Sequence, residues 1–531
     1  MKFLAAWRPP FWAVGAAAIG GPLTALGFPP HDIWPLTLLG VALLASFCWL
    51  LPARRAFAAA WLFGLGCAMG MVWWLTVAMT LHGGMSAPAA WAVLALCMAV
   101  LTSYPALAVG LAAYARQAGL SPLFCAPLAW VGGEWLRGVL LTGFPWLPLA
   151  SGLTGRLELA QTAEWWGASG VSFLLVLTAS LLARGLAPPL ARRALPGRRE
   201  WAALGAALAL VAGGWLWGQA RMTQVATQCA AAPKLVVGVV QPDVAIERLW
   251  RADERMAIIG AQAALSRQAS AAVDGRRPWL VVWPESSTPF YFAHEDPGTS
   301  EVLDLARELD AFVMPAALGL ARRQGKAMTS NRAWLVGPDG RIRGYYDKAH
   351  LVPFGEYVPL GEVLFWVRAL AQIGGDQAAG RPGVLLEADG VKIGALICYE
   401  SIFAYLGRAQ RLAGATLLVN QTNDAWYGPS GASAQHMSHL VFRCIENRLA
   451  CARSANTGVS GFVLPDGRMA GLTDIFQPAW RVMALPLAGP ETTFFTRHGD
   501  LVGPICAGAM PPLWAVAWLR RRRDKRRSEN A

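Results

Sequence analysis

Long runs of apolar residues fill the first part of the chain and return once near its C-terminus. A helix that crosses a bilayer needs about 20 predominantly apolar residues. The pattern therefore predicts an α-helical transmembrane bundle over residues 1–222, which holds seven spans, and an eighth span after a long intervening segment. The expected spans are residues 10–28, 33–51, 56–81, 87–115, 122–141, 163–186, 200–219 and 498–520.

The intervening segment, residues 233–490, has a different pattern. Short β-branched runs alternate with longer charged stretches of helical periodicity, which is typical of an α/β domain. We expect helices at residues 247–272, 300–309 and 438–455, and hairpin turns where Pro-Asp-Gly occurs at 338–340 and 465–467. The expected strands are residues 234–240, 280–283, 311–314, 333–336, 391–397, 415–419 and 461–464.

The composition supports a membrane protein. Of 531 residues, 55% are hydrophobic, 15% are charged and 25 are tryptophans, which favour the water interface of a bilayer. Much of the net charge of +13 lies in alternate loops between the predicted spans and in the basic tail, residues 521–531. Because positive loops stay in the cytoplasm, both termini are expected there and residues 233–490 on the outer side. This distribution argues against a nucleic-acid partner.

Three segments of residues 233–490 each lead to a residue whose side chain can take part in catalysis. An apolar run ends at Cys398, another leads to Glu285, and a strand end or turn presents Lys348. A lone cysteine is more often a core residue, and a lone acid or amine is more often a solvated charge. The prediction of a site rests on the three residues occurring together at the ends of such segments, where they can meet at one edge of a sheet.

The chemistry that these residue types support is nucleophilic attack on an acyl carbon. A cysteine thiol is mostly protonated at neutral pH and needs activation. Glu285 would take the thiol proton, and Lys348 would hold the thiolate and then stabilise the oxyanion of a tetrahedral intermediate. The nine cysteines show no regular spacing, so we expect neither a metal site nor a cofactor.

Residues 283–285, 346–356 and 398–401 resemble the three signature motifs of the nitrilase, or carbon–nitrogen hydrolase, superfamily. The resemblance implies an αββα sandwich for residues 233–490. It also implies that Glu285 is the general base, that Lys348 stabilises the oxyanion and that Cys398 is the nucleophile.

The membrane half is similar to that of a narrower family, the apolipoprotein N-acyltransferases of the bacterial inner membrane. The similarity lies in residues 28–35, in residues 142–146 and in the eight-span layout. It implies that a thioester on Cys398 carries an acyl chain from a phospholipid, expected to be phosphatidylethanolamine, to the N-terminal amine of an S-diacylglyceryl-cysteine apolipoprotein. It places residues 233–490 in the periplasm. The residues to which it assigns supporting or substrate-binding roles are Glu356, Tyr399, Glu400, Trp146 and Trp250.

Two other functions account for part of the pattern. A membrane-tethered amidase or nitrilase would use water as the acceptor and share the first half of the reaction. A transporter or lipid-binding scaffold would have lost the chemistry of its outer domain, which the presence of Glu285, Lys348 and Cys398 argues against. Because spans flank the outer domain on both sides, we expect a monomer.

Overall fold

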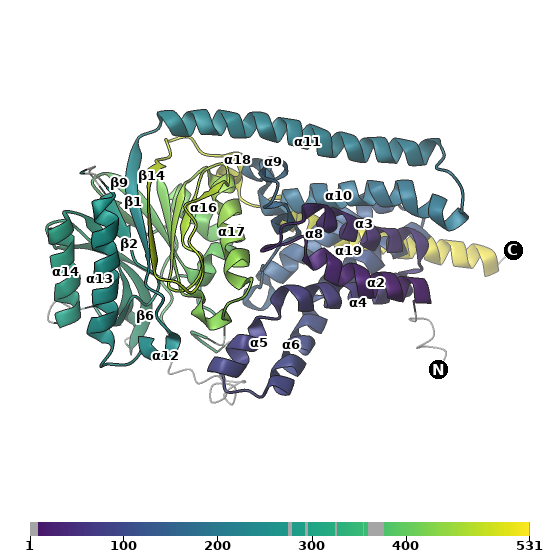
Figure 1. Ribbon diagram of the computed structural model, residues 1–531. Coiled ribbons are helices and arrows are strands. Elements are labelled where there is room, and N and C mark those ends of the chain that lie inside the picture. The colour runs from purple at the N-terminus through teal and green to yellow at the C-terminus, as the bar shows by residue number, and fades with distance from the viewer. Residues whose placement is uncertain are drawn as a thin grey trace. The chain divides into compact units, whose positions relative to one another are not determined.

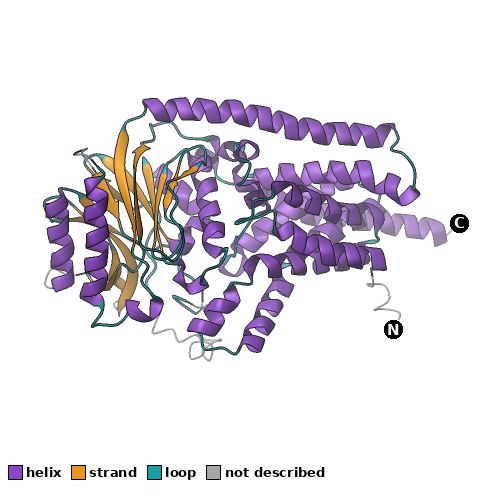
Figure 2. Cartoon of the chain, in the orientation of Figure 1, coloured by secondary structure: helices purple, strands orange, loops and turns teal. Residues whose placement is uncertain are grey.

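The computed structural model describes residues 9–273, 275, 279–292, 296–323, 326–353, 355–358 and 376–529. Phe354, in the second predicted motif, lies outside these residues. The chain forms two compact units, the first made of Met1–Thr76, Met85–Met222 and His498–Ala531, the second of Val77–Gly84 and Thr223–Arg497. All strands that the structure describes belong to the second unit (Figure 2).

The first unit is helical. Five helical stretches among its described residues are long and apolar enough to cross a membrane, with α6 and α7 counted as one stretch, and α2 and α3 are shorter apolar helices. The number of eight spans therefore stays a prediction. The helices are α2 (Phe11–Ala25), α3 (Trp34–Leu50), α4 (Ala53–Val72), α6 (Ala87–Leu101), α7 (Ser103–Gln117), α8 (Pro122–Val139), α9 (Leu157–Ala160), α10 (Ala163–Arg192), α11 (Arg198–Ala231) and α19 (Val502–Glu529).

Two predicted spans differ from the helices observed. The span predicted at 56–81 ends as a regular helix at Val72 and continues as α5 (Leu75–Val77) and the π-helical segment η1 (Ala78–His82). The span predicted at 87–115 is broken between α6 and α7. Pro105 explains this break, since it has no N–H to donate to the carbonyl of Leu101 one turn earlier.

Within its described residues, the second unit forms two sheets. The larger has eight strands in the order β14-β1-β2-β4-β6-β5-β3, with β7 paired to β6, and the smaller has six in the order β13-β12-β11-β10-β9-β8. The first sheet comprises β1 (Lys234–Gln241), β2 (Trp279–Val282), β3 (Thr288–Tyr291), β4 (Phe312–Met314), β5 (Ala316–Arg323), β6 (Lys326–Val336), β7 (Ile342–Asp347) and β14 (Ala479–Pro486). The second comprises β8 (Leu385–Ala388), β9 (Val391–Ile397), β10 (Leu417–Thr422), β11 (Cys451–Ala455), β12 (Gly461–Val463) and β13 (Met469–Ala470).

The two sheets pack against each other, and helices cover their outer faces. Leu280 and Val282 of β2 lie in one core with residues of β9 and β10, whereas Val281 lies in a second core with α13 (Arg255–Ala271) and α14 (Pro297–Leu309). This alternation follows from the two-residue period of a strand that is buried on both faces. The helices α16 (Ala404–Leu412) and α17 (Ala432–Asn447) pack on the second sheet (Figure 1). The predicted αββα sandwich is confirmed.

Local sequence patterns predicted many of these elements, with two clear errors. The helix expected at residues 247–272 is two helices, α12 (Ile246–Leu249) and α13 (Arg255–Ala271), separated by residues 250–254. Residues 438–455 were expected to form one helix, but α17 ends at Asn447 and β11 begins at Cys451. Arg448 adopts a left-handed conformation with φ 49° and ends the helix, and β11 pairs in parallel with β10. No glycine or proline marks this boundary in the sequence. The pairing of β11 with β10 therefore sets the end of the helix. Both predicted Pro-Asp-Gly hairpins are confirmed, since β6 pairs with β7 and β12 with β13 in antiparallel fashion.

Candidate active site

Three strand ends deliver the predicted triad. Glu285 follows β2, Lys348 follows β7 directly, and Cys398 follows β9 and begins the short helix η4 (Cys398–Ile402). All three side chains are buried, with 7%, 1% and 8% of their residues' surface exposed. The first two come from one sheet and the third from the other, so the packing of the sandwich brings them together.

Two carboxylates hold the lysine. Lys348 Nζ lies 2.8 Å from Glu356 Oε1 and 3.4 Å from Glu285 Oε1. The Oε2 atom of Glu356 accepts a hydrogen bond from the Val352 N–H at 2.8 Å. A buried ammonium needs such partners, because it has lost its hydration. The ion pairs fix the lysine beside Glu285.

Burial and the neighbouring carboxylate both favour the protonated form of the Cys398 thiol. Burial raises the pKa of the Cys398 thiol, and the carboxylate of Glu285 raises it further, while Lys348 lowers it in part. Burial lowers the pKa of Lys348, but Glu356 and Glu285 raise it by more, so the net pKa lies well above the usual value. A protonated thiol, a fixed ammonium and a neighbouring carboxylate are the parts that base-assisted attack requires.

Glu400 links residues on both sides of Lys348 to Ile397, which precedes Cys398. Its Oε1 atom accepts hydrogen bonds from Tyr346 Oη at 2.9 Å, the Ala349 N–H at 2.6 Å and the His350 N–H at 3.0 Å. Its Oε2 atom accepts one from the Ile397 N–H at 2.7 Å. Burial raises the pKa of Glu400 to about 7, although these hydrogen bonds oppose the rise. One carboxylate therefore connects the residues that flank Lys348 and Cys398.

The remaining predicted site residues have different surroundings. Tyr399 is buried beside Cys398, and its ring meets that of Phe403 edge-on at 5.1 Å. Trp250 caps the short helix α12 (Ile246–Leu249) and is 53% exposed. Trp146 belongs to the first unit, where it is buried and its ring lies 5.2 Å from that of Trp74. The geometry brings Glu356, Tyr399 and Glu400 to the triad; the roles of the two tryptophans stay predictions.

Two further residues contact Glu285. Asn331 Nδ2 donates to Glu285 Oε1 at 2.7 Å, and the Asn423 N–H donates to Glu285 Oε2 at 3.0 Å. Asn423 comes directly after β10, so the end of a further strand also borders the site. Asn331 lies inside β6, where no local sequence pattern distinguishes it from other strand residues.

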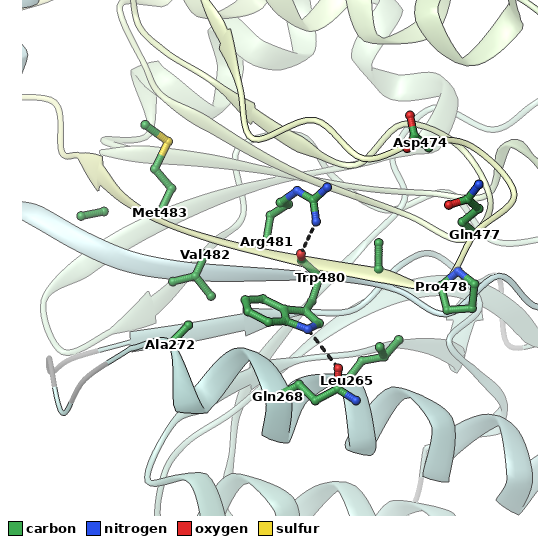
Figure 3. Close-up of a pocket in the computed structure, with 12 residues that line it drawn as sticks. Leu265, Gln268, Ala272, Asp474, Gln477, Pro478, Trp480, Arg481, Val482 and Met483 are labelled. Carbon is green, nitrogen blue, oxygen red and sulfur yellow. Dashed lines mark hydrogen bonds between the residues drawn. The ribbon is translucent and has the colours of Figure 1, made fainter.

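A large surface cavity elsewhere on the second unit lacks these features. It has a volume of about 730 Å³ and lies along β14 and α13 (Figure 3). Trp480 Nε1 donates to Gln268 Oε1 at 3.1 Å across it, and Arg481 donates to the Trp480 carbonyl at 2.9 Å. Among its described lining residues, Asp474 is the one carboxylate and no cysteine accompanies it. Its described lining therefore offers no thiol and no lysine beside a carboxylate.

Comparisons with known proteins cover both units. Residues 20–181 match the family described as apolipoprotein N-acyltransferase N-terminal domain, and residues 237–488 match carbon–nitrogen hydrolase. An apolipoprotein N-acyltransferase of Geobacter metallireducens is 34% identical over 505 residues, which cover 95% of each chain. One of Methylococcus capsulatus is 33% identical over 515 residues, which cover 96% of each chain.

Solved structures resemble about half of the chain. An amidase of the nitrilase superfamily from Nesterenkonia is 18% identical with a TM-score of 0.36, and the match covers 52% of this chain and 96% of the amidase. A nitrilase-superfamily protein of Saccharomyces cerevisiae is 15% identical with a TM-score of 0.37, and the match covers 48% of this chain and 90% of the yeast protein.

Proposed function

The chain belongs to the apolipoprotein N-acyltransferase family, and on this premise we propose that it moves a fatty acyl chain from a phospholipid to the N-terminal amine of a diacylated lipoprotein through a thioester on Cys398. Lipoprotein N-acylation in a membrane follows from the family. The observation that carries the mechanism is Lys348 held between Glu285 and Glu356 beside a buried thiol.

The first half-reaction forms the thioester. Glu285 removes the proton of the Cys398 thiol, and the sulfur attacks the ester carbonyl of the phospholipid. Lys348 stabilises the oxyanion of the tetrahedral intermediate. As the carbon–oxygen bond breaks, Glu285 returns the proton to the leaving glycerol oxygen, and a lysophospholipid departs. Phosphatidylethanolamine is the proposed donor.

The second half-reaction uses the same residues in the opposite direction. Glu285 takes a proton from the α-ammonium group of the lipoprotein's first cysteine, and the free amine attacks the thioester. As the carbon–sulfur bond breaks, Glu285 gives this proton to the Cys398 sulfur, and the second proton that the nitrogen loses on becoming an amide leaves to solvent. A thioester keeps the acyl group reactive, so the two steps need no further energy source. This sequence is a ping-pong mechanism.

The membrane arrangement fits two lipid-anchored substrates. We propose eight spans with both termini and the basic tail in the cytoplasm, and the second unit on the periplasmic side of the inner membrane. The apolar helices of the first unit and the arginine-bearing alternate loops support this placement. Trp250, which is half exposed, is proposed to contact the acyl chain, and Trp146 to line the path of the lipid.

Intact-protein mass spectrometry tests the proposal. The wild type and Cys398→Ala are each incubated with phosphatidylethanolamine in detergent micelles, and a diacylated lipopeptide is then added. We expect a fatty-acyl mass increase in the wild type alone, and its discharge by the lipopeptide. If water discharges the adduct as fast as the lipopeptide does, the chain is a tethered hydrolase. If no adduct forms with any phospholipid, the proposed mechanism is wrong.

A further inference from the structure

A buried ionic cluster lies behind the nucleophile, on the side of its backbone carbonyl. Its members are Asp424 at the start of η5 (Asp424–Tyr427), His436 on α17 and Arg453 on β11. They are 2%, 1% and 0% exposed. The two half-reactions described above use none of these side chains.

The contacts of the cluster lead to Cys398. Arg453 Nη2 donates to Asp424 Oδ2 at 2.6 Å, and Asp424 Oδ1 lies 2.9 Å from His436 Nδ1. His436 Nε2 lies 3.0 Å from the Cys398 carbonyl oxygen. Because a carbonyl oxygen can only accept, His436 Nε2 carries a hydrogen and donates it. The histidine thus connects a buried ion pair to the backbone of the nucleophile.

The ion pair gives the histidine a fixed support. Ser433 Oγ donates to Asp424 Oδ2 at 2.7 Å, and Arg453 Nη1 donates to Asn420 Oδ1 at 2.6 Å. Burial raises the pKa of Asp424, but Arg453 and His436 lower it by more, so the net pKa lies well below the usual value. The carboxylate therefore keeps its charge, and with it the support that orients the ring, across the working pH range.

Cys398 needs such support because its backbone is strained. Its φ of 51° lies in the left-handed region, which is sterically unfavourable for a residue other than glycine. The Cys398 carbonyl accepts a hydrogen bond from Ser401 Oγ at 3.1 Å as well as the one from His436. Since the peptide group is planar, fixing this carbonyl fixes the orientation of the peptide that joins Cys398 to Tyr399.

We propose that His436 is a positioning residue for acyl transfer. It holds the Cys398 carbonyl so that the strained turn directs the thiol toward the base and Lys348. It touches neither substrate nor the reacting atoms, and it acts through the nucleophile's backbone. This role rests on the proposed function for its reaction, but the position of the thiol can be measured without any lipid.

Two substitutions separate this role from a structural one. In His436→Gln the amide nitrogen occupies the place of Nε2, so the donor to Cys398 is kept. In His436→Asn the amide occupies the place of Nδ1, so the contact with Asp424 is kept and the donor to Cys398 is lost. We expect the rate of Cys398 acylation to stay within about threefold of wild type for Gln and to fall on the order of 10- to 100-fold for Asn. The KM for phospholipid should change little in either variant.

A second measurement keeps the test independent of the lipid donor. The rate at which iodoacetamide alkylates Cys398, followed by peptide mass mapping, should fall in the Asn variant and not in the Gln variant. If the wild type forms no acyl adduct but alkylation shows this order, the proposed function fails and the positioning role stands. Equal rates in both variants, or a greater loss for Gln than for Asn, would overturn the role.

Leu440→Ala is the matched control for packing. Leu440 is fully buried on the same helix, and its truncation loosens α17 without removing a donor to Cys398. We expect a lower unfolding temperature with an alkylation rate close to wild type for the folded protein. If Leu440→Ala slows the alkylation of Cys398 as much as His436→Asn does, general loosening of α17 explains the effect and the positioning role is wrong.

Discussion

Replacing Glu356 by glutamine tests how the lysine is held. Glu356 accepts from Lys348 Nζ with one oxygen and from the Val352 N–H with the other, at 2.8 Å each. A glutamine has a single acceptor oxygen, so its NH₂ group must face one of these two donors. Either orientation loses a hydrogen bond and brings two donors together.

The structure gives the size of the effect. At an effective dielectric constant of about 20, the Coulomb attraction of Lys348 to Glu356 is roughly 6 kcal/mol and that to Glu285 roughly 5 kcal/mol. Without the charge of Glu356, the ammonium shifts toward Glu285 and competes with the thiol proton for that carboxylate. A lost hydrogen bond to a charged group costs about 1.5–3 kcal/mol. The rate of Cys398 acylation should therefore fall about 10- to 100-fold.

The assay is single-turnover acylation of Cys398 by phospholipid, followed by intact mass and normalised to folded protein. Glu387→Gln, which removes an exposed carboxylate from β8, is the control and should leave the rate unchanged. Glu356→Asp keeps the charge and should recover part of the rate. A Glu356→Gln rate within twofold of wild type would refute the reasoning, and an Asp variant as slow as Gln would show that side-chain length matters rather than charge.

Four further outcomes follow from the site. Asn331→Ala removes a donor from Glu285 at 2.7 Å and should slow acylation about tenfold in the same assay. Gln421→Leu breaks hydrogen bonds to the carbonyls of residues 283 and 314 in the other sheet and should lower the free energy of unfolding by about 1–3 kcal/mol in denaturant titration. Trp250→Ala should raise KM for phospholipid with little change in unfolding temperature, because the side chain is 53% exposed. Between pH 8 and 5, activity should fall as Glu400 gains a proton near its raised pKa of about 7. Over the same range the contribution of Glu400 to the free energy of unfolding should grow, because the unfolded chain binds that proton only near pH 4.5. Kinetic and thermal-unfolding profiles measure the two trends, and both should be absent from Glu400→Gln.

Local patterns in the sequence were sufficient to locate the strands that carry the triad. The strand predicted at 391–397 coincides with β9, and that at 280–283 overlaps β2, because both are apolar, β-branched runs with polar ends. The lysine was expected at a strand end or turn, and it follows β7 directly. These features depend on neighbouring residues, which a sequence displays.

Contacts between distant segments could not be predicted in the same way. Asn331 reaches Glu285 from the interior of β6, and His436 reaches Cys398 from a different layer. His436 lies just before the helix expected at residues 438–455, although the observed α17 includes it, and nothing local in the sequence distinguishes it from other buried residues. The break before β11 was missed for the same reason, since pairing with β10 rather than a helix-breaking residue ends the helix.

The division of the triad between two sheets has a consequence for how the enzyme tolerates change. Glu285 and Lys348 depend on the first sheet and Cys398 on the second, so their alignment depends on the spacing that the shared core sets. Protein interiors are close-packed, so a substitution in this core changes the spacing between the two sheets. Gln421 spans the same interface, with hydrogen bonds from β10 to the segment just before Glu285. Conservative changes in the core between the sheets should therefore slow acylation before they measurably unfold the protein, because a displacement near 1 Å costs on the order of 100-fold in rate.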